Sequence, residues 1–193
     1  MQFPALLNGQ YLWLERFTSE HIAGLSSIAF DNRIWENLPY DISDPTSFDA
    51  FISELQNKNL NHEQVTYVIR NKINGMVCGS TGFLHMDSQN RQLEIGPTWL
   101  SPIFWGTKIN IESKYLLLET CFEKASIMRV EFKTREANTR SQKAIEKVGG
   151  IKEGLLRCHR LNNDGTFRNT IVYSIIQPEW PATKKLLEAL INK

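Results

Sequence analysis

Residues 99–110 read Trp99-Leu100-Ser101-Pro102-Ile103-Phe104-Trp105-Gly106-Thr107-Lys108-Ile109-Asn110, a stretch that passes from the end of a strand through a loop into a helix. Unpaired backbone amides and the helix dipole make such a place suitable for binding an anion, most naturally a phosphate. An ordinary strand-to-helix turn with a glycine for geometry explains this segment alone equally well. The spacing excludes a P-loop of the form GxxxxGK[ST], and a GxGxxG pattern is absent from it.

Upstream of this stretch the sequence predicts a strand, two helices and three more strands. Alternation over residues 11–17 predicts the first strand. Thr18 or Ser19 can cap the first helix, and Asp44 followed by Pro45 is a strong start for the second. The remaining strands are expected over residues 65–70, 76–85 and 92–100, because the linkers 71–75 and 87–91 contain the Asn, Gly, Asp and Ser typical of hairpin turns.

Downstream of residue 102 the pattern becomes helical, with apolar residues at Ile111, Tyr115, Leu118 and Phe122. A short strand over residues 130–134 follows, and then a helix that Gly149 and Gly150 end. The strands 153–161 and 168–176 flank Asp164-Gly165, which suits a hairpin turn. A last amphipathic helix is expected from about residue 181 to residue 191.

These elements predict an α+β fold, with a mixed, mostly antiparallel central sheet flanked by helices in three layers. The right-handed crossover rule makes the strands on either side of the helix near residues 110–124 parallel, which leaves a crevice where that helix begins. A length of 193 residues predicts one domain. Its parts would be an N-terminal strand with two helices (11–60), a central core (64–150) and a C-terminal hairpin with a helix (151–193).

Composition excludes several classes of protein. Hydrophobic residues make up 41% and charged residues 22% of the chain, which is typical of globular proteins rather than disordered or membrane-spanning ones. The formal net charge of +1 gives no general attraction to nucleic acid or to an anionic membrane, so we expect neither as a partner. Cys78, Cys121 and Cys158 form no CxxC pair, which predicts no metal and fits a reducing cytoplasm. The absence of a leader-like N-terminus also predicts a cytoplasmic protein.

A second stretch, Asn138-Thr139-Arg140-Ser141 followed by Ala144-Ile145-Glu146-Lys147-Val148-Gly149-Gly150, gives the first one a context. With these two stretches, the chain resembles the GCN5-related N-acetyltransferases. The other stretches that carry the resemblance are Leu93-Glu94-Ile95-Gly96, Glu153-Gly154 and Tyr173-Ser174. Within that family it is similar to the RimJ/RimL-like branch, which acetylates protein N-termini on ribosomes. The order of the motifs carries the resemblance over residues 11–176. Two departures stand out: the small residues of the family's loop fall on Lys108 and Asn110, and its tyrosine acid falls on Ile145.

The resemblance implies that acetyl-CoA lies in the crevice. Its pyrophosphate would meet the amides of Phe104, Trp105, Gly106, Thr107 and Lys108, with Asn110 in the following turn. Its pantetheine would run along the strand residues Thr98, Trp99 and Leu100. Asn138 would hold the pantetheine or the acetyl end, and Ser141 could donate a proton to the departing thiolate.

The chemistry of acetyl transfer suggests which residues act. A protonated amine cannot attack, so a base or a water chain must take its proton, and a backbone amide near residues 98–100 could stabilise the oxyanion. Glu94 is the first choice for the base, because alternation places it on one face with Gly96, Thr98 and Leu100. A paired structural carboxylate is the alternative for Glu94. Ser141 could equally bond the carbonyl of Ala137.

The acceptor side is built from the less readable segments. Trp35 and Tyr40 could form the floor of an acceptor pocket or pack in the core, and Tyr173 could reach the same side. A lone His159 on a strand favours a structural role. The sequence therefore predicts an acetyl-CoA-dependent N-acetyltransferase acting on a primary amine, either a protein N-terminus or a small molecule, by direct attack. A non-catalytic module that binds CoA or a partner is the alternative, and a homodimer is expected only by analogy.

Overall fold

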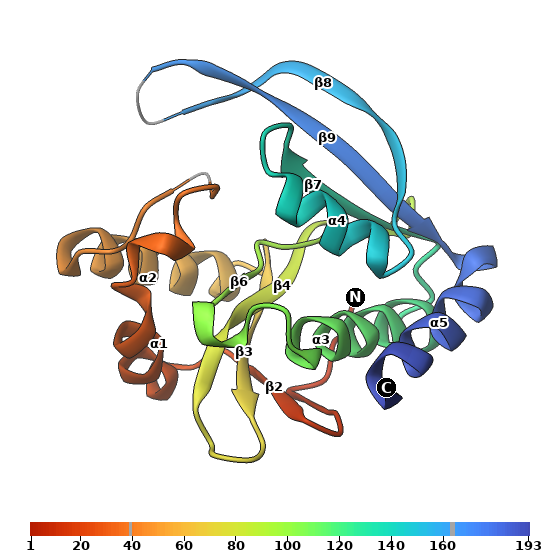
Figure 1. The fold of residues 1–193 in the computed structure, drawn as a ribbon, viewed down its shortest axis with the longest axis horizontal. Helices are drawn as coiled ribbons and strands as arrows, with labels where there is room; N and C mark the ends of the chain where they lie inside the picture. The colour runs from red at the N-terminus through yellow and green to blue at the C-terminus, as the bar shows by residue number, and fades with distance from the viewer. Residues whose placement is uncertain (39, 163–164) are drawn as a thin grey trace.

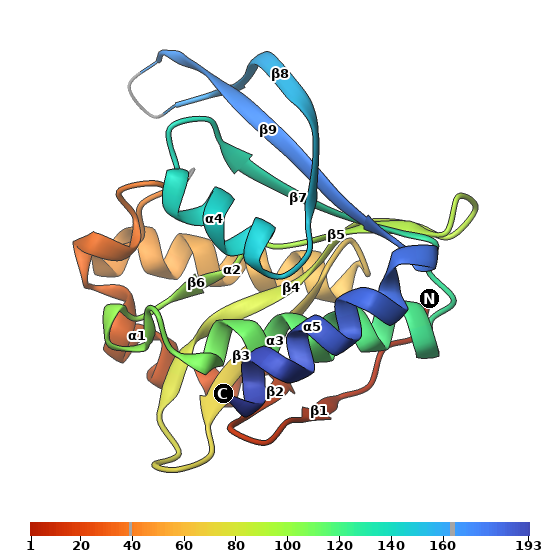
Figure 2. The same ribbon diagram turned by 45° about the vertical axis from the view of Figure 1, so that its right-hand side comes forward.

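The computed structural model describes residues 1–38, 40–162 and 165–193. Within these residues the strands form one nine-stranded sheet in the order β1-β2-β3-β4-β5-β7-β9-β8, with β6 paired to β4 (Figures 1 and 2). All neighbours are antiparallel except β5 and β7, which run parallel. The expected mixed, mostly antiparallel α+β fold is therefore confirmed.

The strands are β1 (Leu6–Asn8), β2 (Leu12–Arg16), β3 (Val65–Asn71), β4 (Val77–Asp87), β5 (Gln92–Ile95), β6 (Trp99–Leu100), β7 (Arg129–Arg135), β8 (Ile151–Leu161) and β9 (Phe167–Ile176). The α-helices are α1 (Ile22–Ala29), α2 (Pro45–Leu60), α3 (Lys108–Glu119), α4 (Thr139–Lys147) and α5 (Trp180–Asn192). The short strand β1 was not predicted. Asp164 of the expected hairpin turn lies outside the described residues, although Leu161 faces Phe167 as a hairpin requires.

The sheet has a hydrophobic core on each face. Tyr67 and Ile69 of β3 point into the core under α3, α4 and α5, whereas Val68 between them points into the core under α1 and α2. Because successive residues of a strand face opposite sides, the two groups of helices cover opposite faces. None of the helices in the described residues is long and apolar enough to cross a membrane.

Side-chain caps set the helix starts. As expected, Asp44 begins α2, and its Oδ1 accepts hydrogen bonds from the amides of Thr46 (3.0 Å) and Ser47 (3.1 Å). Thr107 caps α3 by accepting from the amide of Ile109 at 3.4 Å. These caps satisfy amides that the first turn of a helix leaves unpaired.

The prediction of one continuous strand over residues 92–100 is wrong, because the structure has two strands there. β5 ends at Ile95, the Gly96–Pro97 peptide bond is cis, and β6 resumes at Trp99. Proline has no amide hydrogen to donate to a ladder, so the strand is interrupted there. The interruption changes the alternation: Leu100 shares a core with Leu93 and Ile95, while Trp99 packs in the opposite one.

The interruption also opens the sheet. β5 pairs with β7 only from Gln92 to Glu94. Beyond that point β6 pairs with β4, whereas β7 continues to Arg135 alongside β9. The ends of β6 and β7 therefore part, as the crossover rule led us to expect.

Candidate active site

A cavity of about 980 Å³ lies where β6 and β7 part. Its size falls at the upper end of the range for small-molecule and cofactor sites. One wall is formed by residues 94–100 and the opposite wall by residues 132–135. Helix α3 contributes Asn110 and Lys114, and α4 lines the cavity along its whole length. Residues of α2, of the segment before it and of the β8–β9 hairpin complete the lining. The cavity thus brings together most of the residues predicted from sequence.

The loop before α3 presents open backbone to the cavity. Gly106 has a φ of +74°, and a side chain built there would meet no atom within 4 Å. The indole of Trp105 donates to the carbonyl of Leu100 at 2.9 Å, and the guanidinium of Arg140 stacks on the same indole at 3.7 Å. The amides of Phe104, Trp105 and Thr107 donate to carbonyls within the same loop. The amide of Gly106 has no acceptor among the described residues, so this amide and the N-terminus of α3 form the candidate anion site.

Lys108 does not add its charge to that site. Its Nζ lies 3.2 Å from the hydroxyl of Tyr11 and 5.0 Å from the centre of that ring. Neither Lys108 nor Thr107 lines the cavity, whereas Asn110 does. A cation–π contact with Tyr11, which precedes β2, holds the Lys108 side chain away from the cavity.

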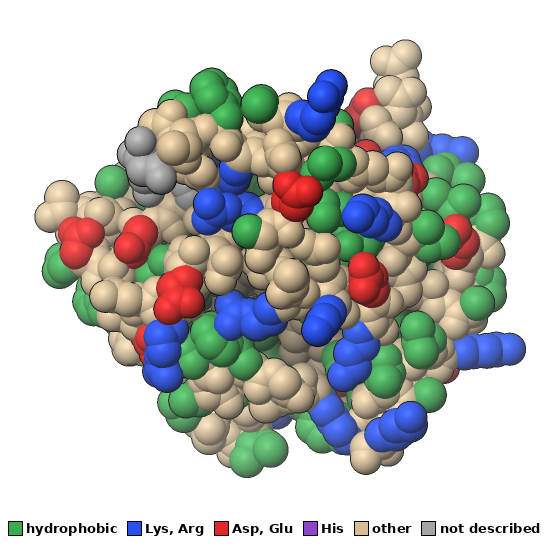
Figure 3. All heavy atoms as spheres, turned by 45° about the horizontal axis from the view of Figure 1, so that its top comes forward, with side chains coloured by type: hydrophobic (Ala, Val, Ile, Leu, Met, Phe, Trp, Pro, Cys, Tyr) green, Lys and Arg blue, Asp and Glu red, His purple; other side chains and the backbone are tan. Residues whose placement is uncertain are grey.

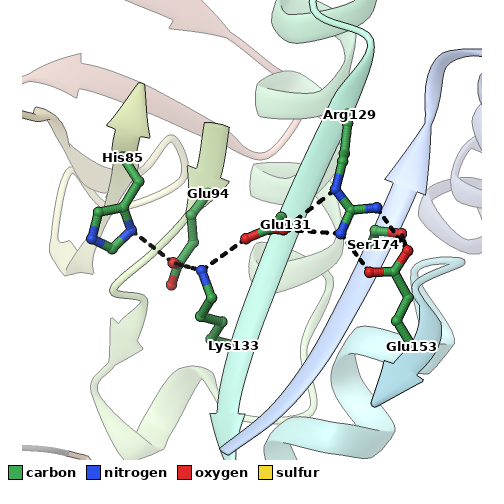
Figure 4. A network of polar contacts seen from close by, with 7 residues as sticks. All are labelled: His85, Glu94, Arg129, Glu131, Lys133, Glu153 and Ser174. Carbon is green, nitrogen blue, oxygen red and sulfur yellow. Dashed lines mark hydrogen bonds and ion pairs between the residues drawn. The ribbon is translucent and has the colours of Figure 1, made fainter. Parts of the chain in front are cut away.

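Glu94 is a paired carboxylate that also faces the cavity (Figure 4). Its Oε2 accepts hydrogen bonds from His85 Nδ1 at 3.0 Å and from Lys133 Nζ at 2.9 Å. Its other oxygen, Oε1, lies beside Gly96 and has no hydrogen-bond partner among the described residues. The residue is 8% exposed. One oxygen is therefore held in place by two hydrogen bonds, while the other is left without a partner beside Gly96 in the described part of the chain.

A chain of ion pairs extends from Glu94 along β7. Lys133 also donates to Glu131 at 2.8 Å, and Arg129 joins Glu131 to Glu153 (Figure 4). Burial opposes the charge on Lys133, but its hydrogen bonds to Glu131 and Glu94 outweigh burial and raise its pKa. Lys133 therefore stays protonated and fixes the position of the Glu94 carboxylate.

Lys114 is a site residue that the sequence reasoning missed. Its Nζ donates to Thr98 Oγ1 at 2.5 Å and to Thr81 Oγ1 at 3.3 Å, and the two hydroxyls are 2.7 Å apart. Burial lowers the pKa of Lys114 to about 7. The signal available in the sequence was the spacing of Asn110 and Lys114, which places both on one face of α3.

Asn138 and Ser141 lie together at the start of α4. Asn138 Oδ1 caps the helix by accepting from the amide of Ser141 at 3.0 Å, and Asn138 Nδ2 reaches the carbonyl of Asn37 at 3.5 Å. Both side chains line the cavity. Asn138 thus joins α4 to the segment before α2.

The three aromatic residues expected on the acceptor side occupy different environments. Tyr40 lines the cavity, and its buried hydroxyl has no hydrogen-bond partner among the described residues. Trp35 packs on Trp99 at 5.1 Å, and its indole donates to the carbonyl of Ala29. Tyr173 is fully buried in the other core and donates to Glu146 at 3.0 Å. For Trp35 and Tyr173 the pocket expectation is corrected, since alternation on β9 and the fold around α1 direct them into the cores.

The structure offers no candidate metal centre within the residues it describes, since no three His, Cys, Asp or Glu side chains gather there in a group that could hold an ion. Cys78 and Cys121 are buried and Cys158 is exposed. Burial raises the pKa of the Cys78 thiol to about 12, which leaves it a poor nucleophile.

Comparison with known proteins gives a consistent family assignment. The model of the acetyltransferase (GNAT) domain matches residues 11–151. The Bacillus subtilis protein called "Putative ribosomal N-acetyltransferase YdaF" is 29% identical over 110 residues, which cover 57% of this chain and 59% of that protein. The match therefore spans somewhat more than half the length of that relative.

Solved structures agree with the fold over nearly the whole chain. The crystal structure of a "putative acetyltransferase" from T. thermophilus is 33% identical with a TM-score of 0.87, and covers 99% of both chains. Mycobacterium smegmatis RimJ, solved in complex with CoA-disulfide, is 24% identical with a TM-score of 0.77, and covers 96% of this chain and 91% of that one.

Proposed function

The chain belongs to the GNAT acetyltransferase family, and we propose that it transfers the acetyl group of acetyl-CoA to a primary amine. The observation that carries the proposal is the cavity between β6 and β7, which joins the open Gly106 loop to the unpaired oxygen of Glu94. The acceptor class, a protein N-terminal amine or a small amine, belongs to the proposal. The name of YdaF refers to ribosomal acetylation and supports the first of these acceptors.

The residues present fit acetyl-CoA. The unpaired amide of Gly106 beside the α3 N-terminus suits a pyrophosphate, and the stacked pair Trp105–Arg140 suits an adenine ribonucleotide. The parted ends of β6 and β7 leave strand edges free for the amide groups of a pantetheine. The RimJ structure, which contains CoA-disulfide, has the same fold and supports this assignment. When bound, acetyl-CoA would supply an activated thioester.

Glu94 Oε1 is the proposed proton acceptor, directly or through a water. Lys133 and His85 hold the carboxylate through Oε2. The carboxylate therefore keeps its position when Oε1 accepts a proton. Thr98 to Leu100 supply backbone near the reacting centre that could stabilise the oxyanion. Ser141, at the first turn of α4, is the proposed proton donor to the departing sulfur.

Amine-dependent release of CoA tests the proposal. The wild type should release free CoA from acetyl-CoA only when an amine is present, and Glu94→Gln should lower kcat by about 10² to 10⁴. Glu131→Gln is the matched control, because it also removes a carboxylate bonded to Lys133 but does not line the cavity. Tight CoA binding without release on any amine would instead favour a non-catalytic binding module. Equal losses in the two variants would mean that Glu94 is only structural.

A further inference from the structure

The cavity contains an excess of positive charge that the chain as a whole does not have. The formal net charge is +1. The basic residues that line the cavity are Lys58, Lys114, Lys133, Arg135, Arg140, Arg160 and Arg168, and the acidic ones are Asp41, Glu54 and Glu94. Figure 3 shows Lys and Arg side chains spread across the middle of one face of the molecule. Such a local concentration of positive charge indicates an anionic ligand.

Some of these charges already have a role. Lys58 pairs with Glu54, and Lys133 pairs with Glu94. Arg140 stacks on Trp105 beside the loop assigned to the pyrophosphate. Lys114 donates to Thr98 and Thr81. The other three, Arg135, Arg160 and Arg168, form no salt bridge with a carboxylate of the described residues. We call these three the arginine cluster.

The arginine cluster brings like charges together on adjacent strands. Arg160 on β8 faces Arg168 on β9 in the register of the hairpin. Arg135 Nη2 and Arg168 Nη1 both donate to Oδ1 of Asn162, at 3.1 and 3.3 Å. Burial, Arg135 and Arg160 together lower the pKa of Arg168. Like charges on facing strand positions are destabilising, so a bound anion would relieve a repulsion built into the site.

Within the described part of the chain, two buried polar atoms without hydrogen-bond partners lie at the arginine cluster. Nε of Arg168 and Nδ1 of His159 are buried and have no hydrogen-bond partner among the described residues. Both residues line the cavity. Burial and the nearby Arg160 lower the pKa of His159, so its ring is neutral at pH 7 and offers one donor and one acceptor. Buried polar atoms normally have hydrogen-bond partners. Where such atoms lack a partner beside a cavity, a bound ligand can supply the missing hydrogen bonds.

The arginine cluster lies near Glu94 in the cavity. Lys133, which bonds Glu94, and Arg135 are two residues apart on the same face of β7. Two residues of a strand span about 7 Å. An anion held by the cluster and an amine presented to Glu94 are therefore within the length of one small molecule or one short peptide segment.

We propose that the arginine cluster binds an oxyanion of the acceptor, so that the acceptor is an amine with a carboxylate or phosphate group a few bonds from its nitrogen. The inference rests on the proposed function, because it concerns the acceptor side of the same cavity. Guanidinium groups bind both kinds of oxyanion through paired hydrogen bonds. Such binding orients the amine toward Glu94 before transfer.

Matched amines that differ by one anionic group test the proposal. The pairs are 4-aminobutyrate and 1-aminobutane, phosphoethanolamine and ethanolamine, and the peptide amides Ala-Glu-Ala and Ala-Gln-Ala. In each pair that reacts, we expect kcat/KM for CoA release to be at least about tenfold higher for the anionic member. The pair with the largest ratio distinguishes a carboxylate, a phosphate and an acidic peptide N-terminus as the source of the oxyanion.

Variants assign the preference to the cluster. Arg160→Gln and Arg168→Gln should each reduce the preference about tenfold through KM of the amine, and Arg168→Lys should restore part of it. Arg157→Gln is the matched control, because Arg157 is exposed on the same strand and lies outside this cavity. Arg160 is also exposed, so its removal should leave the fold intact. The affinity for CoA, measured by calorimetry, should not change in these variants.

Three results would overturn the inference. Equal kcat/KM within every pair would show that the acceptor needs no anion. A preference that survives both glutamine variants would place the recognition elsewhere. A loss of CoA affinity in the variants would assign the arginines to the nucleotide.

The same experiment separates this inference from the proposed function. If no amine of the panel reacts although CoA binds, the proposed function fails. Calorimetric titration of phosphoethanolamine and 4-aminobutyrate into the CoA complex then still tests the anion site, and wild-type binding equal to that of Arg168→Gln would overturn it.

Discussion

Lys114 Nζ donates to Thr98 Oγ1 across 2.5 Å, so a buried lysine of α3 is joined to the segment that separates β5 from β6. No carboxylate of the described residues forms a salt bridge with this lysine. Burial therefore dominates and lowers its pKa to about 7 from its ordinary value of 10.5. An amine that is half neutral near pH 7 thus forms part of the cavity wall.

Lys114→Met should stabilise the protein at pH 7 and remove part of its pH dependence. The unfolded chain binds a proton at this group up to about pH 10 and the folded chain only up to about pH 7, so the stability of the wild type rises between these values. Across this pH range the free energy of unfolding of the wild type rises by at most about 5 kcal/mol because of Lys114. Urea unfolding from pH 6 to pH 10 measures it, and Thr98 and Thr81 keep each other as partners in the variant. A variant whose stability changes with pH as steeply as the wild type would contradict the pKa assignment.

Gly9→Ala should destabilise the contact between the β1–β2 turn and α3. A Cβ at Gly9 would lie 2.6 Å from Cδ of Glu112, whose carboxylate accepts hydrogen bonds from the amides of Gln10 and Tyr11. We expect a loss of about 1–3 kcal/mol in the free energy of unfolding. Gly154→Ala is the control, because a Cβ there meets nothing within 4 Å. Equal effects of the two alanines on the denaturation midpoint would rule out the contact as the cause.

Glu153→Gln should weaken the fold at neutral pH but not in acid. Arg129 lowers the pKa of Glu153 to about 2. The stabilisation by this carboxylate is thus present above about pH 4.5 and is lost as the pH falls toward 2. The side chain is 39% exposed, so solvent screening limits the effect to less than about 1 kcal/mol. Thermal unfolding from pH 2 to pH 7 should show the two curves converging in acid, and a constant offset would argue against the ion pair.

Much of the fold could be predicted because it depends on local signals. Asp44-Pro45 predicts the start of α2, and the crossover rule predicts that β5 and β7 run parallel. The failures come from tertiary context. Alternation alone did not reveal that Gly96–Pro97 changes which face Leu100 occupies. Nothing local indicates that Lys108 contacts Tyr11, 97 residues away.

The candidate site was predicted in part for a similar reason. Glu94, Gly106 and Asn138 stand at strand and helix ends, where a motif has a readable position, and all three line the cavity. Lys114 and Arg168 lie inside regular elements. Lys114 acquires its role from contacts with β4 and with the segment before β6, and Arg168 from its pairing with β8. Sequence periodicity predicts which residues share one face of a helix or strand. A binding site also depends on which of these faces come together in the folded chain.

Calorimetric titration with acetyl-CoA tests directly whether the cavity beside Gly106 binds the acyl donor. Four proteins are compared: the wild type, Gly106→Asn, Gly106→Asp and Gly75→Asp. Gly75 has nearly the same positive φ as Gly106, and a side chain at either position meets no atom, so Gly75→Asp controls for backbone strain and for charge. Asparagine at position 106 keeps the size without the charge.

We expect one-to-one binding by the wild type and by Gly75→Asp, a small loss of affinity in Gly106→Asn, and a loss of about tenfold or more in Gly106→Asp, where a carboxylate would meet the pyrophosphate. Equal affinity in all four proteins, or no binding by the wild type at millimolar acetyl-CoA, would contradict this expectation.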